Sequence, residues 1–159
     1  MTRDVNVLLP VARTRCLAGI DRCRNEGLDI RVTSTLRTAE EQYALFAQGR
    51  KPYGTVCYAR LVAKLPRIEP NENVTVTKVL TSIHQFALAW DFAIIVDGKV
   101  SSDHSLYLKA GVIFEGFGCV WGGRFGETVP GRGDGWDAGH CQYTAGLTLD
   151  ALKAGKRPK

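Results

Sequence analysis

The sequence predicts an α+β domain in which helices flank a small, mainly antiparallel sheet. Helical periodicity occupies residues 10–27 and later segments, and the stretches between them alternate or are continuously apolar over strand lengths. Asp97-Gly98 is a tight turn signal, which joins strands in an antiparallel pair. The 159 residues, 45% of them hydrophobic, suffice for a single domain with its own core.

The first predicted helix covers residues 10–27, within an N-terminal helix region of residues 1–27. Its apolar side chains recur at helical spacing with arginines between them. Pro10 suits a first helical turn, and Gly27 suits a helix stop.

The next two elements are a strand and a second helix. Residues 29–35 alternate and are rich in β-branched side chains, which predicts a strand. Thr38 followed by Glu41 reads as a capping box, so a helix begins there and runs to about Gln48, with Gly49 as its C-terminal stop.

Residues 50–81 are predicted to form a long loop. Residues 74–77 within it are a candidate short strand. A loop of this length inside a compact domain is usually functional or mobile, so a flap beside a site is one interpretation. The interruptions that favour a loop are Pro52, Gly54, Pro66, Pro70 and Asn71.

The second half of the chain is predicted to be mostly strands. Residues 88–96 form the most apolar segment, which indicates a central strand. The other expected elements are a return strand from 99, a helix from 102 or 103 to 117, a strand at 119–121, a glycine-rich loop at 122–135, a strand at 139–143 and a short helix at 148–154.

Charge is modest and uneven. The net charge is +5, and the residues 153–159 form a basic tail. A basic tail favours polyanions such as nucleic acid, anionic lipid or an acidic wall polymer, although a solubilising terminus is an equal interpretation. No nucleic-acid-binding motif accompanies the charge, so we expect no nucleic-acid partner.

Neither a transmembrane segment nor a signal peptide is recognisable in the sequence, so we expect synthesis in a cytoplasm. The five cysteines are an odd number and contain no CxxC pair, which argues against a disulfide framework. Cys16 and Cys23 are interpreted as small core residues.

Histidines and aspartates in the second half suggest a metal site. Asp91 follows His84 by seven residues at the entry to the apolar strand, and Asp137 precedes His140 by three. Two histidines and one aspartate can hold zinc with an open position for water, and the remaining aspartate would then be a base. The alternative is that these are ordinary polar residues at strand ends.

Two other polar residues, Arg37 and His104, differ in what their positions indicate. Arg37, between a strand and a helix, can bind a substrate carboxylate or an oxyanion, or be an ordinary surface arginine. His104, in a polar helix start, is expected at the surface.

The ordered motifs Ser82-x-His84-x6-Asp91 and Asp137-x2-His140 resemble those of the VanY-type D-alanyl-D-alanine carboxypeptidase family of zinc peptidases. Residues 33–50 resemble the arginine-bearing segment of the same family. The branch with the greatest similarity is the phage L-alanyl-D-glutamate endopeptidase endolysins, whose closing helix resembles residues 147–158.

This resemblance implies a fold, a cofactor and a role for each residue. The fold is that of the zinc DD-peptidases and hedgehog-like domains, and the cofactor is Zn²⁺. The implied zinc ligands are His84, Asp91 and His140. By the same resemblance Asp137 is the catalytic base, Arg37 holds the substrate or the oxyanion, and Ser82 lines the substrate site.

The implied function is hydrolysis of the L-Ala–D-Glu bond in the peptidoglycan stem peptide, by a monomeric phage endolysin. Such an enzyme is made in the host cytoplasm and acts on the cell wall after release. The alternatives are a D-Ala–D-Ala carboxypeptidase or dipeptidase, and a non-catalytic, zinc-stabilised wall-binding domain.

Three features depart from the family pattern. Ala87 stands where the family usually has glycine, and the loop at 50–81 is longer than in the short endolysins. Cys141 and Gln142 follow the last histidine, so a carboxylate supporting that histidine would have to come from elsewhere. The alternation of a strand directs Cys141 away from the zinc site, into the core.

Overall fold

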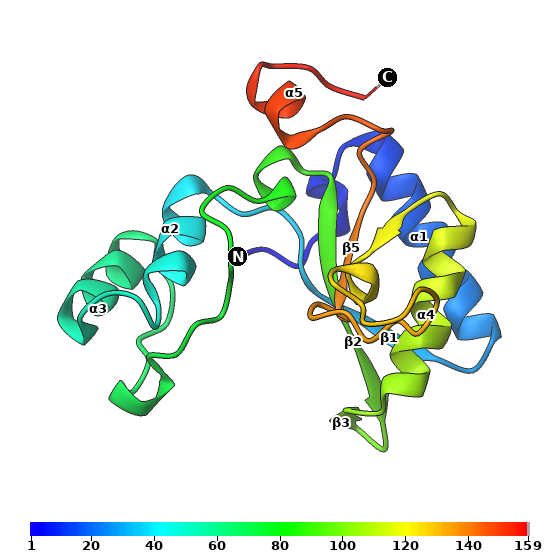
Figure 1. Cartoon of the computed structure of the whole chain (residues 1–159), viewed down its shortest axis with the longest axis horizontal. Coiled ribbons are helices and arrows are strands. Elements are labelled where there is room, and N and C mark those ends of the chain that lie inside the picture. The colour runs from blue at the N-terminus through cyan, green and yellow to red at the C-terminus, as the bar shows by residue number, and fades with distance from the viewer. Residues whose placement is uncertain (159) are drawn as a thin grey trace.

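A five-stranded antiparallel sheet organises the computed structural model, which describes residues 1–158 (Figure 1). The strands pair in the order β1-β2-β5-β4, and β3 pairs with the far end of β2. This arrangement confirms the predicted α+β class. The strand bounds are β1 Asp29–Ser34, β2 Ala89–Val96, β3 Lys99–Val100, β4 Val120–Trp121 and β5 His140–Gln142.

Five α-helices surround the sheet. Helices α1 and α4 lie side by side on one face, and α2 and α3 stand together on the other side of the molecule (Figure 1). Among residues 1–158, no helix combines the length and apolar composition needed to cross a bilayer. The helix bounds are α1 Pro10–Asn25, α2 Ala39–Ala47, α3 Tyr53–Val62, α4 His104–Gly116 and α5 Leu149–Lys153.

Alternation along β2 separates the core from the site. Trp90, Phe92 and Ile94 are buried in the main core beneath α1 and α4, where Phe114 packs against both aromatic rings. Because successive side chains on a strand point to opposite faces, Asp91 projects from the other face of the sheet. The apolar run therefore carries one carboxylate on the surface opposite the core.

The predicted starts and stops of the first elements are confirmed. Thr38 caps α2, and the reciprocal bonds between Thr38 and Glu41 form the capping box. Gly27 and Gly49 follow α1 and α2 with φ values of +81° and +70°, the left-handed conformation that glycine adopts without steric cost.

The prediction of a loop over residues 50–81 is wrong for its first third, where α3 forms. Pro52 precedes the helix as its N-cap, a position where the missing N–H costs nothing, and Gly54 is tolerated in the first turn. Val56 packs with Ala47 of α2 and Ile68 in a small separate core. Helix α3 is therefore stabilised by packing on α2. Proline and glycine positions in the sequence do not reveal this packing.

The candidate strand at residues 74–77 is also absent, because the segment has no ladder partner. Side chains hold this segment instead. Gln48 Nε2 donates to Glu72 O over 2.9 Å, and Gln42 Nε2 donates to Val79 O over 2.7 Å. Residues 72–79 thus follow α2 back toward the sheet and lead into the site.

Four of the five cysteines are buried, free thiols in the main core: Cys16, Cys23, Cys119 and Cys141. The core assignment of Cys16, Cys23 and Cys141 is confirmed. Burial raises the pKa of Cys16 and of Cys119 to about 12, so these thiols stay protonated and unreactive in the folded protein.

Candidate metal centre

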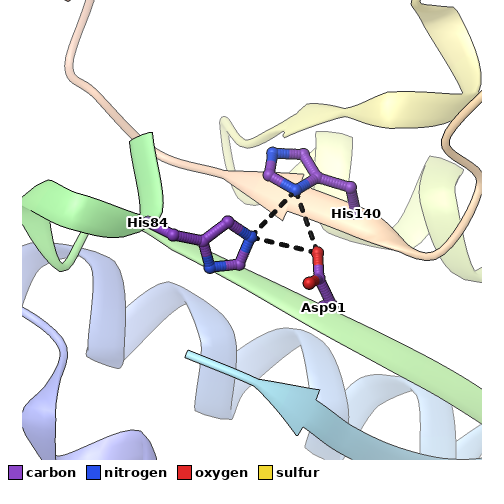
Figure 2. Close-up of side chains that lie close together, drawn as sticks. All are labelled: His84, Asp91 and His140. Carbon is purple, nitrogen blue, oxygen red and sulfur yellow. Dashed lines mark hydrogen bonds and ion pairs between the residues drawn. The ribbon is translucent and has the colours of Figure 1, made fainter. Parts of the chain in front are cut away.

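Three side chains from separate elements converge on the sheet face opposite the core (Figure 2). Asp91 of β2 lies directly opposite His140 of β5 in the antiparallel register. His84 comes from a 3₁₀ turn, Ile83–Phe86, that leads into β2. Antiparallel pairing and a short turn therefore bring together residues that are up to 56 positions apart.

The three converging atoms form a nearly equilateral triangle. His84 Nε2 and His140 Nδ1 each lie 3.1 Å from Asp91 Oδ1 and 3.3 Å from one another. Ligands at about 2.0–2.1 Å from a tetrahedral zinc ion are separated by about 3.3–3.4 Å. Two imidazole nitrogens and a carboxylate oxygen are also the donors that zinc prefers, so the residues fit a zinc ion with one open position.

Each histidine is oriented by its other ring nitrogen. The Nδ1–H of His84 donates to the backbone carbonyl of Thr35, and the Nε2–H of His140 donates to Gln142 Oε1 over 3.1 Å. These bonds fix the neutral tautomers that leave the converging nitrogens free to bind a cation. Gln142 therefore supplies the acceptor for His140 that the sequence analysis expects from a carboxylate elsewhere.

Thr35 is itself fixed by the N-terminal segment. Its backbone N–H donates to Thr2 O over 2.8 Å, and its hydroxyl donates to Asp4 O over 3.0 Å. The residue is fully buried. The start of the chain thus holds the carbonyl that orients His84.

Arg37 lies beside the second oxygen of Asp91. Its Nη2 forms an ion pair with Asp91 Oδ2, its Nη1 donates to Gln42 Oε1 over 3.3 Å, and its Nε donates to Ser34 Oγ over 3.4 Å. These contacts use three of its five N–H groups. The ion pair leaves Asp91 Oδ1 directed at the two histidines.

The polar and charged groups around Asp91 favour its ionised form. Burial by itself raises the pKa of this carboxyl, but the polar contacts with His140 and His84 outweigh burial and hold the pKa far below its usual range. Burial lowers the pKa of His84, which keeps its imidazole neutral. For His140 the charge and hydrogen bond of Asp91 outweigh burial, and the pKa is raised.

Asp137 is a second carboxylate on the wall of the same cavity. Its backbone carbonyl accepts the His140 N–H over 3.0 Å, so the two residues share one tight turn. Burial raises the pKa of its carboxyl, with a further contribution from the charge of Asp91. A carboxyl with a raised pKa is a stronger base, which suits proton transfer to and from a substrate.

An open cavity of about 570 Å³ lies over these residues. Its lining includes most of residues 76–83, with Ser82 among them, and also Phe125 and Trp136. Lys78 Nζ lies 4.6 Å from the centre of the Trp136 ring, so these two parts of the chain approach one another beside the cavity. Residues of the predicted loop therefore do border the site.

Ala87 adopts the conformation expected of the glycine that it replaces. It ends the 3₁₀ turn with φ +56° and ψ +35°, in the left-handed region. An alanine there costs about 1–2 kcal/mol, yet the turn still delivers His84 to the site. The methyl group of Ala87 is therefore compatible with a turn that places His84 beside Asp91 and His140.

Among the sequence-predicted residues, the structure brings six together at this cavity: Arg37, Ser82, His84, Asp91, Asp137 and His140. His104 lies elsewhere and is exposed, as expected. Sequence reasoning missed Gln142, Thr35 and Gln42. The sequence pattern could have indicated Gln142, because residues two apart on a strand share a face and Gln142 follows His140 by two.

Comparison with protein-family models finds no match, and none of the curated proteins is significantly similar. Solved structures do match. ChiX, an L-Ala D-Glu endopeptidase of Serratia marcescens, gives a TM-score of 0.55 at 17% identity over 93% of this chain and 86% of that one. The vancomycin-resistance D,D-pentapeptidase VanY, solved with Zn(II), gives 0.53 at 20% identity over 92% and 76%.

A third match is the LD-carboxypeptidase LdcB, with a TM-score of 0.51 at 16% identity over 86% of this chain and 58% of that one. The chain has the fold of these peptidases. The resemblance seen in the sequence motifs is thus confirmed at the level of the fold, and the converging residues occupy one face of a shared scaffold.

Proposed function

We propose that the chain is a zinc peptidase that hydrolyses peptide bonds in the stem of bacterial peptidoglycan. The observation that carries the proposal is the triangle of His84, Asp91 and His140, with edges that fit zinc, at the base of a cavity that also holds Asp137. The fold shared with three solved peptidases supports the same reaction class.

The residues divide the chemistry between them. Zinc bound by the two histidines and Asp91 would polarise the scissile carbonyl and acidify a water molecule. Asp137 accepts the proton of the attacking water and returns it to the leaving amine. Arg37 contributes positive charge beside the carbonyl oxygen, and Ser82 lines the approach of the peptide.

For the bond cleaved, we propose L-Ala–D-Glu, and for the biological role, a monomeric phage endolysin made in the host cytoplasm and released to the wall. The sequence motifs and the likeness to an L-Ala D-Glu endopeptidase support this choice. A carboxypeptidase acting on D-Ala–D-Ala is the second candidate, since a neighbour of the same fold was solved with D-alanine-D-alanine.

Mass spectrometry of peptidoglycan digests tests the proposal. Purified protein is incubated with peptidoglycan, with added zinc or with a chelator. Chelator-sensitive release of stem peptides that carry a new D-Glu amino terminus is expected. Loss of a terminal D-Ala alone would assign the carboxypeptidase reaction, and no zinc-dependent cleavage by folded protein would contradict the peptidase proposal.

Variants separate the assigned roles. Asp137→Ala should retain zinc and lose about 10²–10⁴-fold in kcat, because a general base is removed without a ligand. His140→Ala should lose both zinc and activity. Asp150→Asn, which changes an exposed side chain on helix α5, serves as the matched control and should change neither. Full activity in Asp137→Ala would refute the assignment of the base.

A further inference from the structure

Helix α3 presents an apolar face to solvent. Tyr58, Leu61 and Val62 lie on this face at i, i+3 and i+4 spacing and are 68%, 72% and 52% exposed. Tyr43 of α2 is 44% exposed beside them. Scattered exposed apolar residues are ordinary, but a contiguous group of this kind marks an interaction surface.

Two shallow hollows extend this face on either side of Tyr58. One, of about 400 Å³, lies between α2 and α3 and includes Tyr43 and Val62. The other, of about 480 Å³, includes Leu61 and Leu65. The α3 face, defined here as Tyr43, Tyr58, Leu61, Val62 and Leu65, is therefore one continuous apolar surface. It is separate from the residues that line the metal centre.

Positive charge predominates around the α3 face. Residues 42–68 contain five arginines or lysines, and the acidic residues that flank them include Glu40, which lines the first hollow, and Glu69. Arg60 is buried and bonded to Gln48, so it belongs to the interior. The other four cations are exposed and lie at the two ends of the helix: Arg50 and Lys51 before it, Lys64 and Arg67 after it.

The apolar side chains and the flanking cations together limit the kinds of partner that the α3 face can bind. Aliphatic side chains such as Leu61 and Val62 are stabilised when apolar groups of a partner remove them from water, and a charged wall polymer lacks such groups. A second copy of the chain would bring the same four cations face to face, which opposes self-association. Anionic lipid supplies both the apolar phase and the negative charge, and tyrosines suit the boundary between them.

We propose that the α3 face docks on an anionic phospholipid bilayer, with the helix lying in the interface plane. The four cations at its ends then contact lipid headgroups, while Tyr58, Leu61 and Val62 enter the acyl boundary. This surface is separate from the metal centre, so lipid binding can be tested independently of peptidase activity.

Co-sedimentation with vesicles tests the proposal on the full chain. Vesicles of phosphatidylcholine and of phosphatidylcholine with phosphatidylglycerol at 7:3 are compared at low and high salt. Binding to the anionic vesicles at low salt is expected, with weakening at high salt and little binding to the neutral vesicles. Absence of binding to anionic vesicles, or equal binding to both, would overturn the proposal.

Matched variants locate the binding surface. Leu61→Ser/Val62→Ser should weaken binding at least tenfold, and Lys64→Gln/Arg67→Gln should weaken it about 25-fold, at about fivefold for each cation. Val100→Ser/Val112→Ser removes two exposed aliphatic side chains elsewhere and should bind as the parent does. Circular dichroism verifies that each variant is folded.

Three other outcomes would refute the proposal. Unchanged vesicle binding by Leu61→Ser/Val62→Ser would show that charge alone acts, as for a wall polymer. Loss of binding in Lys153→Gln/Lys156→Gln but not in the α3 variants would assign the interaction to the basic tail. Dimerisation in sedimentation velocity that Leu61→Ser/Val62→Ser abolishes, without vesicle binding, would make a second copy the occupant.

Discussion

At the scale of single residues, Gln142 shows how an uncharged side chain can support a metal ligand. Its Oε1 accepts the Nε2–H of His140, which fixes the ring orientation and the tautomer. An amide oxygen does this without adding a second negative charge beside Asp91. The His140 imidazole is consequently positioned by Gln142 and not by a carboxylate.

Replacing Gln142 should therefore weaken zinc binding. We expect Gln142→Leu to lower zinc affinity about 10–100-fold, since the ring loses its acceptor. Gln142→Glu, which keeps an acceptor, should retain or increase affinity. Competition with a chromophoric chelator measures the affinity. Equal affinities for Gln142→Leu and the parent protein would contradict this role.

At the scale of elements, the turn that carries Asp137 and His140 is seated on Gly122, at the end of β4. A Cβ atom on Gly122 would lie 2.2 Å from Asp137 O and 3.0 Å from His140 Cβ. Backbone cannot move away as a flexible side chain can. The absence of a side chain at Gly122 thus lets the turn reach the cavity.

The variant Gly122→Ala should displace this turn. We expect a loss of about 1–3 kcal/mol in the free energy of unfolding from overpacking, together with weaker zinc binding. Gly116→Ala is the matched control, because a Cβ there meets nothing within 4 Å. Chemical denaturation and zinc titration are the measurements. Parent-like zinc affinity in Gly122→Ala would argue against the positioning role.

At the scale of the whole molecule, the buried thiols make the fold sensitive to alkaline pH. Burial raises the pKa of Cys16 and Cys119 to about 12 and that of Cys23 to about 11. The unfolded chain ionises these thiols from about pH 8.5 upward, whereas the folded chain keeps them protonated. Their contribution to stability is therefore complete below that pH and is lost as the pH rises.

Unfolding by urea at pH 7.5 and pH 10, under reducing conditions, should reveal this loss. Each thiol that ionises only in the unfolded chain lowers the free energy of unfolding by about 1.4 kcal/mol per pH unit. Cys57→Ser is the control, since Cys57 lies outside the main core and the variant should keep the same pH dependence. A stability that does not fall between the two pH values would contradict this account.

The metal centre and the α3 face lie on different parts of the whole molecule. Alternation along β2 places the metal centre on the sheet face away from α1 and α4. Helix α3 extends on the side of α2 (Figure 1). Because the α3 face shares no lining residue with the cavity, lipid docking and peptide entry do not compete for the same residues.

The elements that depend on interactions between near neighbours in the chain follow from the amino-acid sequence alone. Three signals depend on neighbours within a few positions: the helical periodicity of α1, the Thr38–Glu41 capping box of α2 and the apolar run of β2. All three of these elements are present in the structure. The spaced motifs also identified the residues that converge at the cavity, although their roles as ligands and base stay predictions.

The features that depend on contacts between distant residues emerge with the folded structure. Helix α3 forms because Val56 packs against α2 and Ile68. The proline and glycine residues of this segment predict a loop, because they carry no information about that packing. The partners of the histidines, Thr35 and Gln142, are set by how the turn before β2 and the strand β5 meet β1 and β2. Local patterns cannot specify these pairings, because packing and strand register join residues tens of positions apart.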